Sequence, residues 1–150
     1  MKKLISARLA GNILLVSLGL LVVFHVLVLL GAVPADIVWG GMIQGAQTNL
    51  ILLETIALLI TILFILIVAA KVGYIQAGKL SGVVNAGVWL IFAFLLLNTL
   101  GNLASGVSFE NLIAAPATIL LALCALRLAI EKYAWLTLSP CSLSSTPSSY

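Results

Sequence analysis

Residues 50–70 read LILLETIALLITILFILIVAA, an apolar run of 21 residues that contains one charged side chain, Glu54. A transmembrane helix needs about 20 mostly apolar residues to cross a hydrocarbon core about 30 Å thick. A strand of a membrane β-barrel would instead alternate apolar and polar residues over about 10 positions. The run therefore predicts a helix that spans a membrane.

The rest of the chain repeats this pattern. The whole sequence is 63% hydrophobic and 7% charged, whereas soluble domains are about 25% charged, so a soluble fold is excluded. The predicted connections are short, and short connections make successive helices antiparallel neighbours. We therefore predict an all-α, polytopic membrane protein, an antiparallel bundle of four transmembrane helices within residues 1–133. The spans are residues 13–33, 50–70, 83–100 and 112–130.

The charges predict the orientation of these spans. Residues 34–49 and 101–111, which connect spans one to two and three to four, contain no Lys or Arg. Basic residues close to the end of a span stay in the cytoplasm, so the sequence predicts a multi-pass protein with both termini cytoplasmic. All seven basic residues then fall on that side: Lys2, Lys3, Arg8, Lys71, Lys79, Arg127 and Lys132.

The last 17 residues, 134–150, differ in composition from the spans. They contain six Ser, two Thr and two Pro, too little apolar surface to bury a core. We interpret them as a flexible cytoplasmic tail. The fourth span carries a stripe of small residues at helical spacing, which would let another helix approach closely. The stripe consists of Ala114, Thr118, Ala122, Ala125 and Ala129.

Polar residues inside the spans indicate a site. An ionisable side chain at the centre of a transmembrane helix costs about 2.5–3.5 kcal/mol on insertion scales. At 1.5 Å per residue, His25 lies about 8 Å below Leu30, and Glu54 lies about 6 Å below Leu50. Three spans therefore bring polar groups to one depth near the outer surface, since Asn98 ends the third span there.

We interpret this layer as a polar pocket that opens to the outside, with Glu54 as its charged anchor and His25 or Asn98 as the hydrogen-bond partner. Each residue also has an ordinary reading: Glu54 can extend to water, His25 can be a packing residue, and Trp39 can be an interfacial anchor. The candidate ligand-binding residues are Glu54, His25, Asn98, Asp36, Trp39, Gln47 and Asn102.

Other chemistry is not indicated by the sequence. No metal-ligand spacing, P-loop or other cofactor motif is present, and we assign no catalytic residue. The glycine-rich stretch 40–45 follows no strand, so a dinucleotide site does not fit its context. Basic residues on one side of a membrane suggest anionic lipid headgroups as partners, not nucleic acid.

Several short stretches resemble small bacterial four-span membrane proteins of a family that carries no assigned activity. The resemblance covers about residues 25–132 and implies the same architecture in a bacterial inner membrane. Small multidrug transporters also have four spans and an intramembrane Glu, but theirs lies in the first helix. The resembling stretches are Asp36-Ile37-Val38-Trp39-Gly40-Gly41, Glu54-Thr55, Lys71-x-Gly73-Tyr74, Asn98-Thr99-x-Gly101-Asn102 and Leu126-Arg127-Leu128-Ala129.

These observations leave three hypotheses for function, in this order. The first is a protein that binds a lipid or small molecule in the pocket around Glu54, as a transport or accessory subunit. The second is a scaffold that pairs with another membrane protein or with a second copy, its polar residues joining helices. The third is an intramembrane enzyme with Glu54 and His25 as acid and base, which requires the two side chains within hydrogen-bond reach.

Overall fold

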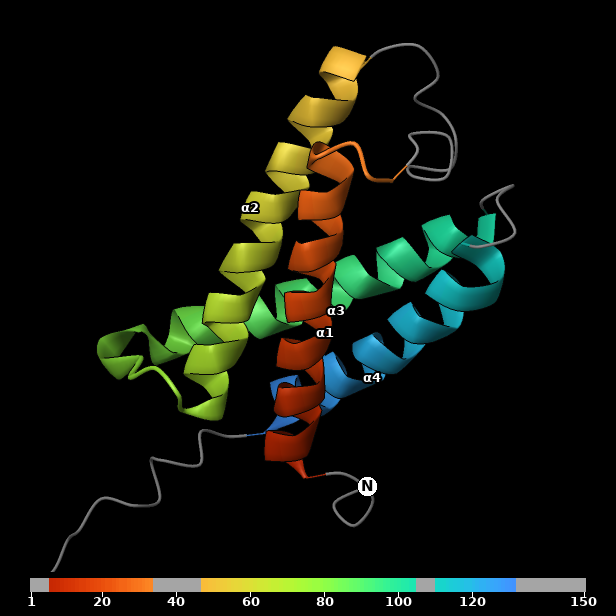
Figure 1. Cartoon of the computed structure of the whole chain (residues 1–150). Helices are drawn as coiled ribbons and strands as arrows, with labels where there is room; N and C mark the ends of the chain where they lie inside the picture. Colours follow the sequence, from red (N-terminus) through yellow and green to blue (C-terminus); the bar gives the residue numbers. More distant parts are fainter. Residues whose placement is uncertain (1–5, 34–46, 105–109, 132–150) are drawn as a thin grey trace, which may run out of the picture.

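The computed structural model of this chain describes residues 6–33, 47–104 and 110–131. Within these ranges the chain is helical apart from turns and short connections (Figure 1). Four of the helices are long and apolar enough to span a membrane. This confirms the predicted all-α class and the four apolar helices. The elements are α1 (Ala7–Leu29), α2 (Gln47–Val72), η3 (Gly78–Leu80), α3 (Ser81–Ala104), η4 (Glu110–Ala114) and α4 (Ala115–Ile130).

The first helix begins and ends earlier than the predicted span 13–33. The Ser6 side chain accepts a hydrogen bond from the Leu9 N–H at 3.1 Å, which satisfies one of the unpaired amides at a helix start. At the other end, Gly31 has a φ of 73°, a left-handed conformation that glycine adopts readily and that ends a helix. The span prediction missed the start because hydropathy measures membrane crossing, whereas capping decides where a helix begins.

The other helices also differ from the predicted spans at their ends. The second extends from Gln47 to Val72, beyond the predicted 50–70, and stops before Gly73, whose φ is 96°. The third, α3, extends the predicted 83–100 by a few residues at each end.

The fourth predicted span, 112–130, consists of a π-helical turn, η4, followed by α4. Pro116 lies in the first turn of α4, where its missing N–H is not needed as a donor.

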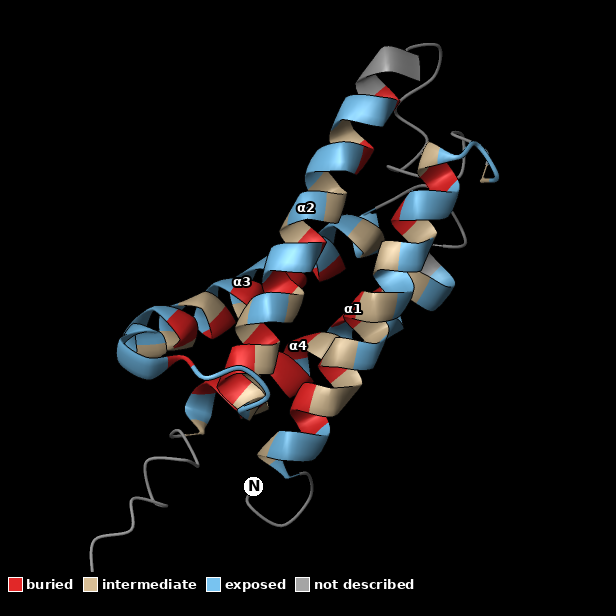
Figure 2. Cartoon of the chain, turned by 60° about the vertical axis from the view of Figure 1, so that its left-hand side comes forward, coloured by how far each residue is buried: buried red, intermediate tan, exposed pale blue. Residues whose placement is uncertain are grey.

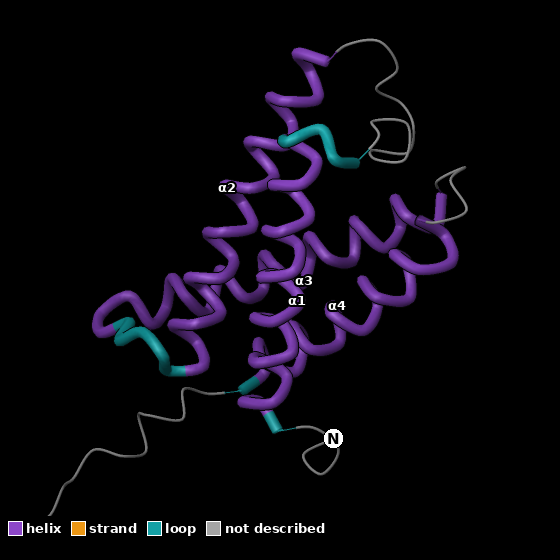
Figure 3. Tube along the Cα trace, viewed as in Figure 1, coloured by secondary structure: helices purple, strands orange, loops and turns teal. Residues whose placement is uncertain are grey.

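The helices are arranged as two pairs, α1 with α2 and α3 with α4. Figures 1 and 3 show that the second pair is strongly inclined to the first. The pairs meet near the start of α1 and the end of α2, and they diverge toward the end of α1 and the start of α2. We call the first of these ends the Lys71 end, and the opposite part of the molecule the Glu54 half. The structure is therefore two inclined pairs rather than four evenly aligned helices.

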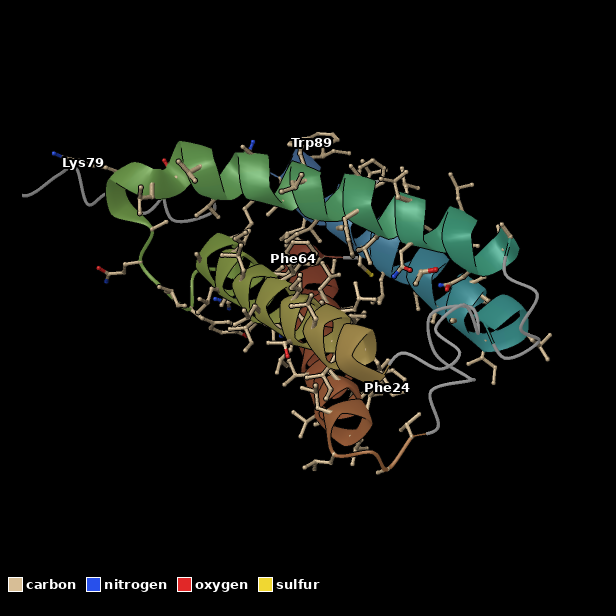
Figure 4. All side chains as sticks on the ribbon, turned by 90° about the horizontal axis from the view of Figure 1, so that it is seen from above. Phe24, Phe64, Lys79 and Trp89 are labelled. Atoms are coloured by element: carbon tan, nitrogen blue, oxygen red, sulfur yellow. The ribbon has the colours of Figure 1, made fainter. Side chains whose placement is uncertain are left out.

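The main core lies toward the Lys71 end. Its buried residues come from the first part of α1, the second part of α2 and the second part of α4, with residues 88–95 of α3. Phe64 lies between α2 and α3 (Figure 4), with its ring edge-on to Phe94 at 5.3 Å between centroids. Residues on the outward sides of the helices are exposed and mostly apolar (Figure 2), as expected for surfaces that contact lipid.

Two glycines allow close approach between helices. A Cβ on Gly11 of α1 would lie 2.2 Å from the Val72 side chain of α2, and a Cβ on Gly87 of α3 would lie 3.0 Å from Ile67 of α2. The predicted small-residue stripe of α4 is also largely buried, including Thr118, Ala122, Ala125 and Ala129. Small residues therefore set the distances between these helices.

Candidate functional site

His25 and Glu54 form a buried pair between α1 and α2. The His25 Nδ1 and Glu54 Oε2 atoms are 2.6 Å apart. Only 9% of His25 and 1% of Glu54 is exposed. Of the two hydrogen-bond partners predicted for Glu54, His25 or Asn98, the structure brings His25 into contact with it. The contact also meets the distance requirement for an acid–base pair.

One proton is shared in this contact. Either the imidazole Nδ1–H donates to the carboxylate, or the protonated carboxyl group donates to a neutral imidazole. A separation of 2.6 Å is shorter than the usual 2.9–3.0 Å, approximately, of a neutral N–H···O bond.

An apolar cluster lies beyond the pair, toward the end of α1. It consists of the buried Val28 and Leu50, with Phe24 and Val33 packed against them. The Phe24 ring also stands edge-on to the His25 ring, with 6.1 Å between centroids. Val28 and Leu50 thus lie between the pair and the nearest helix ends along α1 and α2.

The other predicted site residues are not brought to the pair by any described contact. The Asn98 side chain is exposed on α3, and Asn102 is half-buried further along the same helix. Gln47 is the first residue of α2 and lies on the same face of that helix as Glu54. Its side chain is not among those that the structure describes. Asp36 and Trp39 lie outside the described residues.

Thr99, next to Asn98, is the buried polar residue of α3 in this region. Its hydroxyl donates to the Thr118 hydroxyl of α4 at 2.9 Å. The polar layer that the sequence predicts across three helices is thus divided: His25 and Glu54 join one pair, and Thr99 and Thr118 join the other. Asn98 lies four residues from Phe94, whose ring contacts Phe64 of α2, so it shares the side of α3 that faces the first pair.

Sequence reasoning missed a second polar cluster, at the Lys71 end. Lys71 was expected in a connection, but it lies in the last turn of α2 and is only 6% exposed. Its Nζ donates to Asn85 Oδ1 of α3 and to the main-chain oxygen of Glu131, just after α4, both at 2.7 Å. The one available signal was that Lys71 follows the apolar run of span two without a break.

No metal centre is assigned within residues 6–33, 47–104 and 110–131, where no three His, Cys, Asp or Glu side chains gather. No family model, curated protein or solved structure matches this chain. Function is therefore argued from the two polar clusters alone.

Proposed function

We propose that this chain is a multi-pass protein of a bacterial cytoplasmic membrane, with antiparallel helices and both termini in the cytoplasm. The distribution of basic residues supports this orientation, since all seven fall on one side of the proposed membrane. The Lys71 end then faces the cytoplasm, and the Glu54 half lies toward the outside.

We further propose that the protein binds a lipid or another small molecule at the His25–Glu54 pair, as a transport or accessory subunit. The observation that carries this proposal is a 1% exposed carboxylate bonded to an imidazole within an apolar span. Desolvation of a buried ion pair can exceed its Coulombic gain, and an apolar pair of similar volume often joins two elements equally well. Joining α1 to α2 therefore does not by itself account for these two residues.

The surroundings of the pair favour a lipid over a water-soluble ligand. The cluster around Val28 and Leu50 covers the pair toward the outer surface, so a ligand approaches from the side, where lipid lies. The contact with Glu54 uses Nδ1 of His25, and the second ring nitrogen, Nε2, can donate to or accept from a headgroup.

Thermal unfolding in detergent tests the binding proposal. We expect phosphatidylethanolamine or phosphatidylglycerol to raise the melting temperature of the wild-type chain and to raise that of Glu54→Gln much less. Thr118→Val is the matched control, because it removes a buried polar group from the other helix pair and should keep the wild-type lipid response. Equal responses of wild type and Glu54→Gln to these lipids and to a panel of polar metabolites would overturn the proposal.

The second candidate function is a scaffold that pairs with another membrane protein or with a second copy. It is favoured by the observation that every buried side-chain nitrogen and oxygen in the described residues has a hydrogen-bond partner, as expected if the polar residues only join helices. Crosslinking in native membranes separates the two functions: a stoichiometric partner without any lipid response favours the scaffold. The acid–base enzyme stays third, since no observation indicates a substrate.

A further inference from the structure

Three polar contacts between helices differ in what they join. The His25–Glu54 contact lies within the first helix pair, and the Thr99–Thr118 contact lies within the second. Lys71, in contrast, reaches from the first pair to two elements of the second, Asn85 on α3 and the residue that follows α4. The cross-pair hydrogen bonds of Lys71 are thus located where the pairs converge (Figure 1).

We infer that Lys71 is a releasable latch between the two helix pairs, and that its release loosens the packing of one pair against the other at the Lys71 end, around the core that they share. This inference does not depend on the proposed ligand. It assigns to Lys71 control over how closely one pair packs against the other.

The docked position of Lys71 is well defined. One acceptor is a side-chain amide oxygen, and the other is a main-chain carbonyl at the carboxyl end of α4, where the helix dipole favours a cation. The carboxylate of Glu131 is 2.6 Å from Arg127 Nη1. Lys71 thus donates to the main-chain oxygen of Glu131, whereas Arg127 pairs with the Glu131 side chain. Three helices are therefore held through a single ammonium group.

The released position is also accessible to Lys71, because of where it lies in α2. Val72 is the last residue of the helix, and Gly73 follows. A lysine at the end of a span can extend its four-carbon stem along the apolar surface and place its ammonium group among the headgroups or in water. The ammonium group of Lys71 therefore has hydrogen-bond partners in both the docked and the extended state. A buried lysine at the middle of a span could not reach the headgroups or water in this way.

Distances between spin labels in lipid nanodiscs test the latch. In a chain with Cys124→Ala and Cys141→Ser, labels replace Leu9 on α1 and Leu80 at the end of η3, both exposed side chains at the Lys71 end. We expect Lys71→Met to add a longer-distance population that the parent chain lacks, and Lys71→Arg, which keeps the charge, to restore most of the parent distribution.

Tyr74→Phe is the matched control. The Tyr74 hydroxyl donates to Asn12 Oδ1 at 2.9 Å, a polar contact at the same end but within the first pair, so its loss should leave the distribution unchanged. Identical distributions for Lys71→Met and the parent would overturn the latch. If Lys71→Met fails to fold, Asn85→Leu removes one acceptor, and we expect a smaller shift in the same direction. A distribution for Asn85→Leu that coincides with the parent would then overturn it.

Discussion

At the scale of single residues, the decisive quantity is the cost of separating His25 from Glu54. Neutral hydrogen bonds between membrane helices contribute about 1–2 kcal/mol in model peptides, whereas breaking a buried ion pair costs about 3–5 kcal/mol. Both side chains of this 2.6 Å contact are buried, so removing one leaves the other without this partner inside an apolar span. We expect Glu54→Leu to lower the free energy of unfolding by about 3–5 kcal/mol, measured by titration with a denaturing detergent.

The double variant His25→Leu with Glu54→Leu is the control for this prediction. With both polar groups removed, no desolvated charge remains, and we expect stability equal to the wild type or above it. If the losses of the two single variants simply add in the double variant, the side chains are not coupled and the contact has been misread.

His25 could be predicted as one of two possible partners of Glu54, the other being Asn98, because this prediction needed only depth. A rise of 1.5 Å per residue places both residues at a similar distance below the surface. Depth could not decide in the same way which of the neighbouring residues Asn98 and Thr99 points into the helix contacts. Adjacent residues differ by about 100° around a helix axis, and the buried side of α3 depends on where α2 and α4 pack against it.

At the scale of helices, the contact between α1 and α2 depends on Gly11. A Cβ at this position would lie 2.2 Å from the Val72 Cγ2 atom, and valine is stiff because it branches at Cβ. We expect Gly11→Ala to reduce the free energy of unfolding by about 1–3 kcal/mol, the usual cost of overpacking. Unfolding in a denaturing detergent measures the change.

Gly19 supplies the control on the same helix, because a Cβ there would meet nothing within 4 Å. We expect Gly19→Ala to be neutral or stabilising by up to about 1 kcal/mol, from helix propensity alone. A similar loss for both variants would show that backbone flexibility, not the approach of α2, explains the effect.

The polar contacts of the two helix pairs should act independently. The Thr99–Thr118 bond belongs to α3 and α4, and each hydroxyl also bonds its own helix backbone, Thr99 to Leu95 and Thr118 to Ala115. We expect Thr118→Val to cost about 0.6 kcal/mol, the average for such contacts. Combined with Glu54→Gln, its effect should add to within about 0.3–0.5 kcal/mol in a double-mutant cycle. A larger coupling energy would mean that the two pairs communicate through the Glu54 half.

Helix ends were predictable only in part. Hydropathy identifies the residues that cross the membrane, and all four runs coincide with helices. The start of α1 depends instead on the Ser6 cap, and the end of α2 depends on Gly73. These are local signals in the sequence, but they compete with a continuous apolar pattern that has no sharp boundary.

At the scale of the whole molecule, the inclination of the two pairs was beyond the sequence pattern. The lengths of the apolar runs indicate that four spans exist and that the connections are short, which fits both an aligned bundle and two inclined pairs. The difference depends on close contacts between particular residues, such as Gly87 of α3 against Ile67 of α2. It depends equally on Lys71, whose position as a buried donor between helices follows from packing and not from its place in the sequence.

The proposed orientation of the molecule in the membrane rests on charge and can be tested directly. If all seven basic residues lie in the cytoplasm, green fluorescent protein fused after Tyr150 should fluoresce, and alkaline phosphatase fused there should be inactive. Alkaline phosphatase inserted after Gly106, in the connection without Lys or Arg, should be active. Three added lysines in that connection would compete with the cytoplasmic charges, and we expect them to reduce this activity. An active phosphatase at Tyr150 of the unmodified chain would reverse the orientation, placing the Lys71 end outside and the His25–Glu54 pair toward the cytoplasm.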